Sequence, residues 1–131
     1  MGSSREENRD STSRGRLAPA GFSRLAEGSY HARLAGSFGV GVVLFTAPHC
    51  GACRAWKQVL PQALADLANE FHEVDVSEAT GVARYFGIFH LPTIHLYRDG
   101  RFHAELQCEA RPETIREVAQ QLLAAPPQDE P

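Results

Sequence analysis

The sequence has little cysteine, no excess of basic charge and no long apolar run. Its 131 residues include three cysteines, fewer than the dense and usually even sets that staple small secreted domains. A net charge of -3 gives no basic footprint for nucleic acid. The longest uncharged stretch, residues 34–53, is broken by glycines, whereas a membrane span needs about 20 mostly apolar residues. We therefore expect a soluble, cytoplasmic monomer with no nucleic-acid partner and no membrane contact.

Composition divides the chain into one domain and two tails. Residues 1–20 are rich in Ser, Arg and Glu and carry almost nothing apolar, so they predict a disordered N-terminal tail. Residues 126–131 combine prolines with acids and predict a second disordered tail. The segment between them, residues 21–125, has a suitable length for one compact domain.

Strand and helix patterns alternate within this domain. Residues 40–46 are continuously apolar, which is typical of a strand covered by helices on both faces. Asp99-Gly100 is a strong signal for a hairpin joining the last two strands. The remaining patterns predict strands at 22–26, 71–76, 93–97 and 102–108, and helices at 30–34, 50–69, 78–85 and from Pro112 onward. This order predicts an α/β fold with a central mixed sheet flanked by helices on both faces.

The chemistry concentrates at the junction of the apolar strand and the helix that follows it. There, two residues separate Cys50 from Cys53. Unpaired amides in the first turn of a helix favour negative charge, so we expect a lowered pKa for the Cys50 thiol. Cys53 lies one turn further along, within reach of Cys50, so the pair can resolve a mixed disulfide internally. Gly51 keeps the turn permissive.

A zinc site is the alternative reading of two cysteines at this spacing. It would require a second such pair or suitably spaced histidines, and the sequence provides neither. A remaining metal hypothesis combines Cys50, Cys53 and Cys108 with a histidine nearby. The placement of the pair within a strand-helix-strand pattern favours redox chemistry, with no metal and no cofactor beyond the dithiol itself.

About four fifths of the chain resembles the thioredoxin family. Residues 45–54, Phe-Thr-Ala-Pro-His-Cys-Gly-Ala-Cys-Arg, resemble the family's Phe-Trp-Ala-Pro-Trp-Cys-Gly-Pro-Cys-Lys. Residues 85–93 resemble its Tyr-Gly-Ile-x-x-Ile-Pro-Thr loop, residues 98–100 its Lys-Asn-Gly hairpin, and residues 24–30 and 74–76 its first and central strands. The resemblance implies a thioredoxin fold and thiol-disulfide oxidoreductase activity.

The resemblance also implies a substrate-binding rim around the two cysteines. Pro92 should be a cis-proline facing the dithiol, and the backbone of Leu91 should pair with a bound substrate strand. By position, the remaining rim residues are His49, Gly51, Ala52, His90 and Cys108. The implied partners are a protein disulfide substrate and a reductant such as a thioredoxin reductase or glutathione.

The chain departs from the family at the centre of this region. Leu44 stands where thioredoxins bury an acid that serves as proton acceptor for the second cysteine, so we expect a slower resolving step. His49 replaces an aromatic residue and Ala52 a proline, while His90 and Cys108 fall where glycine is usual. These departures keep a second function open, a docking module of thioredoxin fold with weak or no redox turnover.

Overall fold

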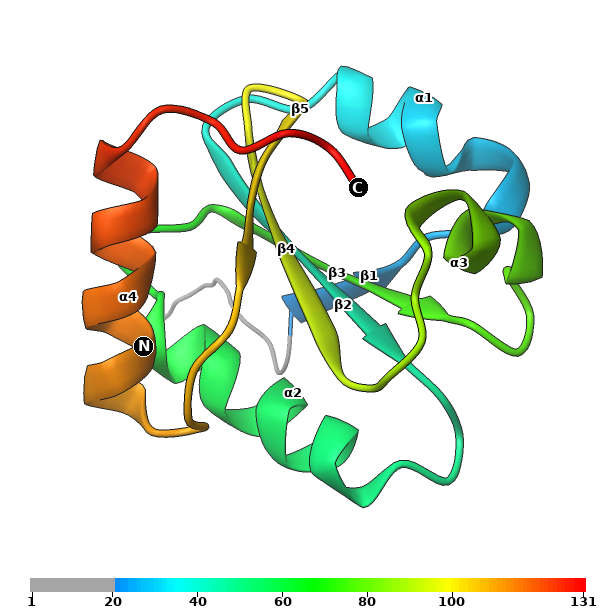
Figure 1. Cartoon of the computed structure of the whole chain (residues 1–131), viewed down its shortest axis with the longest axis horizontal. Helices are drawn as coiled ribbons and strands as arrows, with labels where there is room; N and C mark the ends of the chain where they lie inside the picture. The colour runs from blue at the N-terminus through cyan, green and yellow to red at the C-terminus, as the bar shows by residue number, and fades with distance from the viewer. Residues whose placement is uncertain (1–20) are drawn as a thin grey trace, which may run out of the picture.

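A computed structural model describes residues 21–131, which form one mixed sheet of five strands (Figure 1). Their order across the sheet is β1-β3-β2-β4-β5. β3 is parallel to both of its neighbours, whereas β4 is antiparallel to both β2 and β5. The strands are β1 (Phe22–Arg24), β2 (Val40–Thr46), β3 (Glu70–Asp75), β4 (Thr93–Arg98) and β5 (Arg101–Leu106). The predicted tail at residues 1–20 lies outside the described residues.

Helices cover both faces of the sheet, as the order of elements predicted (Figure 1). α2 and α4 pack on one face, and α1 and α3 pack on the other. The helices are α1 (Tyr30–Ala35), which follows the short 3-10 turn η2 (Glu27–Ser29), α2 (Gly51–Ala63), α3 (Thr80–Phe86) and α4 (Pro112–Ala124). Within residues 21–131, no helix has the length and apolar character needed to cross a membrane.

The central strand β2 carries side chains into both hydrophobic cores. Its bounds are those predicted from the apolar run, and Val42, Val43, Leu44 and Phe45 are all 0% exposed. Successive side chains of a strand point to opposite faces, so Val42 and Leu44 join the core under α2 and α4. Val43 and Phe45 join the core under α1 and α3. The missing polar alternation in the sequence therefore reflects burial on both faces.

The hairpin between β4 and β5 is confirmed. Asp99 and Gly100 both have positive φ, 51° and 81°, which is the requirement of a two-residue type I′ turn. A Cβ on Gly100 would lie 2.6 Å from the carbonyl oxygen of Leu34, so glycine is required there for space as well as for conformation.

Several predicted boundaries are wrong. α2 ends at Ala63 instead of Asn69, and the residues up to 67 form turns. Pro61 has no N–H to donate to the preceding turn, and the helix ends within three residues of it. The chain then turns toward the sheet, where Asn69 N–H donates to Val40 O at 2.9 Å. The first strand ends at Arg24 and the last strand at Leu106, because pairing with neighbouring strands sets these limits more than composition does. α3 begins at Thr80 instead of Glu78, after a turn in which the N–H groups of Glu78 and Ala79 donate to Asp75 O.

The residues after α4 have no helix or strand, yet they lie along β5. Gln128 N–H donates to His103 O at 2.7 Å, and Gln128 Oε1 accepts from Glu105 N–H at 3.1 Å. Further on, Glu130 accepts a hydrogen bond from the Tyr85 hydroxyl at 3.1 Å. The irregular C-terminal segment at 126–131 therefore contacts both the edge of the sheet and α3.

His95, on β4, is buried among aromatic rings, and neither of its ring nitrogens has a hydrogen-bond partner within residues 21–131. It is 1% exposed, and its ring centroid lies 4.9 Å from that of Phe45, 5.2 Å from that of Phe86 and 5.0 Å from that of Phe102. Burial lowers the pKa of His95 from 6.5 to about 4, since a charged imidazolium would lose its hydration there. The folded protein therefore holds His95 neutral.

This burial predicts acid destabilisation. The unfolded chain binds a proton at His95 as pH falls below 6.5, whereas the folded chain resists protonation until about pH 4. At about 1.4 kcal/mol for each unit of pKa difference, the free energy of unfolding should fall by about 3 kcal/mol across that window. His95→Leu should remove this component, and the exposed His31→Leu should retain it. Urea unfolding at a series of pH values measures the difference, and equal slopes for the two variants would contradict the interpretation.

Candidate functional site

Strand pairing gathers the predicted site residues at one end of the sheet. Phe45, near the end of β2, pairs with Thr93 at the start of β4, and Thr46 pairs with Asp75 at the end of β3. Ile94 in turn pairs with Leu106 at the end of β5. The segments that carry Cys50 and Cys108 follow β2 and β5 at this end of the sheet, and the segment that carries Pro92 enters β4 there. Residues far apart in sequence therefore share one surface.

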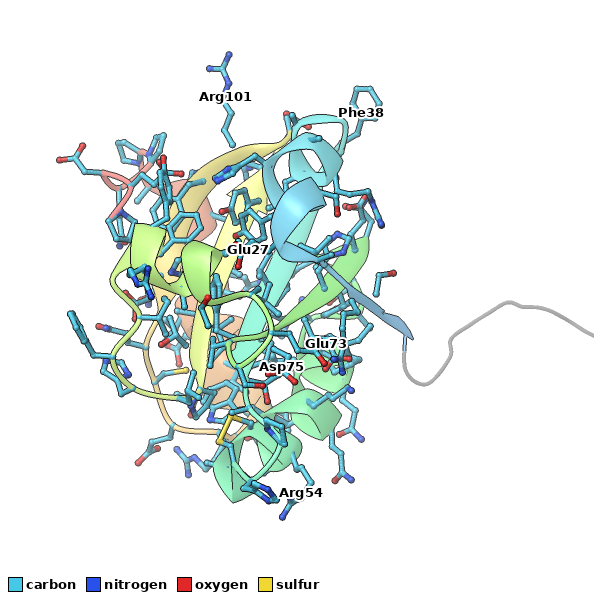
Figure 2. The ribbon with its side chains drawn as sticks, turned by 90° about the vertical axis from the view of Figure 1, so that its right-hand side faces the viewer. Glu27, Phe38, Arg54, Glu73, Asp75 and Arg101 are labelled. Carbon is cyan, nitrogen blue, oxygen red and sulfur yellow. A yellow bond between two sulfur atoms is a disulfide. The ribbon has the colours of Figure 1, made fainter. Side chains whose placement is uncertain are left out.

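Cys50 and Cys53 form a disulfide at the N-terminus of α2 (Figure 2). Cys50 occupies the N-cap position, and its Sγ accepts a hydrogen bond of 3.1 Å from the backbone N–H of Cys53. The two Cα atoms are 5.2 Å apart. Cys53 is 1% exposed whereas Cys50 is only half-buried, so one sulfur faces an incoming molecule and the other lies beneath it.

The neighbouring residues His49, Gly51 and Ala52 are exposed and surround Cys50. Among residues 21–131, no hydrogen bond or ion pair joins His49 to either cysteine. A Cβ on Gly51 would meet only the end of the Arg54 side chain, at 3.8 Å. Gly51 therefore leaves open space above the disulfide, and Arg54 is the nearby positive charge at this end of α2 (Figure 2).

The Leu91–Pro92 peptide bond is cis, as the resemblance implied. Leu91 and Pro92 are half-buried, and His90 before them is exposed. The Thr93 hydroxyl donates to His90 O at 2.7 Å, which ties the loop to the first residue of β4. The loop therefore presents its backbone at the end of the sheet where the disulfide lies.

Cys108 is a free thiol packed against the core under α2 and α4. Burial, and secondarily the Glu109 carboxylate, raise the pKa of the Cys108 thiol. No amide of a helix N-terminus donates to its sulfur among the described residues. Cys108 therefore has none of the features that would activate it as a nucleophile.

A shallow groove of about 290 Å³ adjoins the cis-proline loop. Phe89 forms one wall and is 94% exposed, an unusual state for a phenylalanine. The groove is lined by Val76, Thr80, Ala83, Arg84, Gly87, Ile88 and Phe89. The groove offers an apolar surface close in sequence to Leu91. Nothing in the sequence pattern singles out Phe89 for a role at this surface.

A buried acid lies beside Leu44. Leu44 is fully buried, as expected, and its Cα pairs across the sheet with that of Glu73 on β3. Glu73 is 8% exposed and forms an ion pair with Lys57 of α2, whose Nζ lies 2.9 Å from Oε1. Arg24 Nη2 lies 3.7 Å from the other oxygen of Glu73. The replacement of the family's acid by Leu44, from which a slower resolving step is expected, gives no sign of this second acid on the neighbouring strand.

The described residues contain no group of three or more His, Cys, Asp and Glu side chains arranged to hold a metal ion.

Comparison with known proteins identifies relatives across most of the chain. The family model named Thioredoxin matches residues 22–121. The chain is 39% identical over 61 residues to thioredoxin H-type of Chlamydomonas reinhardtii, covering 45% of this chain and 54% of that protein. It is 26% identical over 84 residues to chloroplastic thioredoxin M4 of Arabidopsis thaliana, covering 63% of this chain and 44% of that protein. These matches span about half the length of both relatives.

Solved structures support the fold. A mutant thioredoxin from Halobacterium salinarum aligns with a TM-score of 0.66 at 18% identity, and the alignment covers 82% of this chain and 96% of the Halobacterium chain. The zinc-bound form of human ERp44 aligns with a TM-score of 0.63 at 18% identity, covering 76% of this chain and 31% of its own.

The unequal exposure of the two sulfurs predicts unequal reactivity after reduction. Iodoacetamide should modify Cys50 first, and at a lower pH than it modifies a model thiol, because the Cys53 N–H stabilises the Cys50 thiolate. Cys53 should be protected by burial, and Cys50 should remain reactive in Cys53→Ser. Peptide mapping by mass spectrometry over a pH series measures both rates. Equal rates at the two thiols, each following a model thiol, would overturn the assignment.

Proposed function

The chain belongs to the thioredoxin family, and on that basis we propose that it is a thiol-disulfide oxidoreductase in which Cys50 attacks and Cys53 resolves. The observation that carries the proposal is the Cys50–Cys53 disulfide, with one sulfur accessible at the N-terminus of α2 and the other buried. An accessible thiol at a helix N-terminus suits a nucleophile, and a neighbour within bonding distance suits the second step.

The two steps transfer two electrons to the substrate. The Cys50 thiolate bonds to one sulfur of the substrate disulfide, and the other substrate sulfur leaves as a thiolate. The Cys53 sulfur then bonds to Cys50 Sγ, and the second substrate sulfur leaves in turn. The substrate is reduced to a dithiol while Cys50 and Cys53 are oxidised to the disulfide.

A protein disulfide is the proposed substrate. The rim residues His49, Gly51, Ala52, His90 and Cys108, with Leu91 and Pro92, border an open surface instead of an enclosed small-molecule pocket. The adjoining groove and the exposed Phe89 ring add an apolar area suited to a side chain of a protein partner. Leu91 is half-buried beside the cis-proline, where its backbone would pair with an extended substrate segment.

A second protein or thiol must return the electrons. We propose a thioredoxin reductase or glutathione. The chain is 30% identical over 60 residues to part of NADPH-dependent thioredoxin reductase 3 of Arabidopsis thaliana, covering 44% of this chain and 11% of that protein. A yeast structure concerning thiol resolution in a mitochondrial 1-Cys peroxiredoxin via glutathione/thioredoxin systems aligns with a TM-score of 0.61 at 21% identity, covering 81% of this chain and 97% of its own.

The cytoplasm is the proposed compartment, where the protein would contribute to cell redox homeostasis. One cysteine pair and one lone thiol are a sparse set compared with the disulfide frameworks of small exported domains. In a reducing compartment the net reaction is reduction of the substrate.

Reduction of insulin by the protein with dithiothreitol tests the proposal. Wild type should accelerate precipitation of the insulin B chain, and Cys50→Ser should abolish the acceleration. Cys53→Ser should form a mixed disulfide that persists, because the second thiol is missing. Wild type that forms no mixed disulfide and gives no acceleration would instead support the docking function, which the altered rim and exposed Phe89 favour.

Cys108 should affect substrate range without taking part in electron transfer. Cys108→Ser should leave the reduction potential of the Cys50–Cys53 pair unchanged, because Cys108 is a free thiol outside that pair and its thiol has a raised pKa. Cys108→Gly should widen the rim and extend reduction to bulkier disulfide substrates. Redox titration against glutathione and a panel of disulfide proteins provide the two measurements. A Cys50–Cys108 disulfide detected by mass spectrometry during turnover would contradict this role.

A further inference from the structure

The resolving step needs a proton acceptor that the two cysteines do not provide. A thiolate is the attacking form of cysteine, so Cys53 must lose its proton before its sulfur bonds to Cys50. Cys53 is 1% exposed, which keeps bulk water from its thiol. The acceptor must therefore lie on the same face of the sheet, under α2.

We propose that Glu73, held by Lys57, is the proton acceptor for Cys53. Lys57 follows Cys53 by four residues on α2, so their side chains lie on one face of the helix in adjacent turns. Lys57 Nζ contacts both carboxylate oxygens of Glu73, at 2.9 Å and 3.1 Å. The carboxylate is thereby bonded to α2 one turn after the residue that carries the thiol, and we expect a side-chain adjustment or one bridging water to join the two groups. This inference rests on the proposed function, since it concerns its second step.

The other groups on this face do not fit the role as well. From β2, Val42, Leu44 and Thr46 present nothing that titrates. From β1, Arg24 is a cation that lies 3.7 Å from Glu73. Asp75 on β3 already accepts from Ser77 N–H at 2.9 Å and from the Ser77 hydroxyl at 2.6 Å, and these bonds lower the pKa of Asp75.

Glu73 and Asp75 are equally exposed, at 8%, and each lies 3.7 Å from Arg24, but of the two only Glu73 is bonded to Lys57 of α2. Both acids lie between the strands and the helix that carries the disulfide (Figure 2). Among the described residues, the Glu73 side chain is contacted by the cations Lys57 and Arg24, so this buried acid has paired charges around it. Lys57 is also the only lysine of the chain. The pair thus couples a buried base to the helix that carries the thiol.

Over one catalytic cycle, the proton that Glu73 accepts is returned to Cys53. The Cys53 proton passes to the Glu73 carboxylate as Cys53 Sγ bonds to Cys50 Sγ, and the substrate sulfur leaves with the electron pair of the broken S–S bond. That thiolate takes a proton from solvent. When a reductant later opens the Cys50–Cys53 disulfide, Glu73 returns its proton to the Cys53 sulfur.

Ellman's reagent, an aromatic disulfide, separates the two steps in one stopped-flow experiment. Reduced protein should release thionitrobenzoate in a first phase, when Cys50 attacks, and in a second phase, when Cys53 resolves. The reference protein and every variant carry Cys108→Ser, so that two thiols report and any effect of position 108 is common to all of them. Glu73→Gln should slow the second phase by about tenfold or more near neutral pH and leave the first phase unchanged. The absence of a first phase in wild type would refute the proposed function instead.

The pH profile distinguishes proton transfer from a structural role. In wild type the second phase should be slower at acid pH than at neutral pH, because a protonated carboxyl group accepts no proton. In Glu73→Gln the second phase should require alkaline pH, where a thiol loses its proton unaided and the two rates converge. Glu73→Asp should slow the second phase less and keep the acid dependence. This variant also serves if Glu73→Gln does not fold.

Matched controls come from the same charge cluster. Glu78 accepts from Arg24 at 3.2 Å but is exposed, so Glu78→Gln should leave both phases unchanged. A wild-type second phase in Glu73→Gln, with a wild-type pH profile, would overturn the proposal. Slowing in Asp75→Asn but not in Glu73→Gln would overturn it as well.

Discussion

The pairing of β2 with both β3 and β4 is the constraint on which the site depends. Because β2 is parallel to β3 and antiparallel to β4, the end of β2 lies beside the end of one neighbour and the start of the other. The chain passes from that end into α2, which places the dithiol at the helix N-terminus opposite the cis-proline loop. Four buried residues of β2 secure this strand in both cores, so the site geometry and the stability of the fold share the same contacts.

Features set by local sequence were predictable. The apolar run of β2, the Asp-Gly turn and the cysteine pair each derive from neighbouring residues, and the structure confirms all three. The end of α2 was not predictable from periodicity, because Leu64 and Leu67 continue the helical spacing while the chain already turns toward β3. A hydrophobic pattern reports which side chains are buried, and turns can bury them as well as helices.

Features that depend on pairing between distant segments escaped the sequence analysis. Glu73 lies in a strand that the sequence did predict, but its neighbours Leu44, Lys57 and Arg24 come from three other elements. One signal was present: an acid at an inward position of a central strand requires a cation, and the single lysine lies on the helix that covers it. His95 was similarly hidden, since nothing local indicates that aromatic rings from three elements surround it.

The C-terminal segment along β5 has a consequence for how the sheet meets other molecules. An outer strand presents unpaired N–H and C=O groups that can template the addition of a foreign strand. Gln128 occupies two of these groups, through His103 O and Glu105 N–H. The chain thus shields its own sheet margin with the irregular segment that follows the last helix. Truncation after α4, or a fusion that pulls these residues away, would leave that margin open to self-association without altering a single residue of the dithiol site.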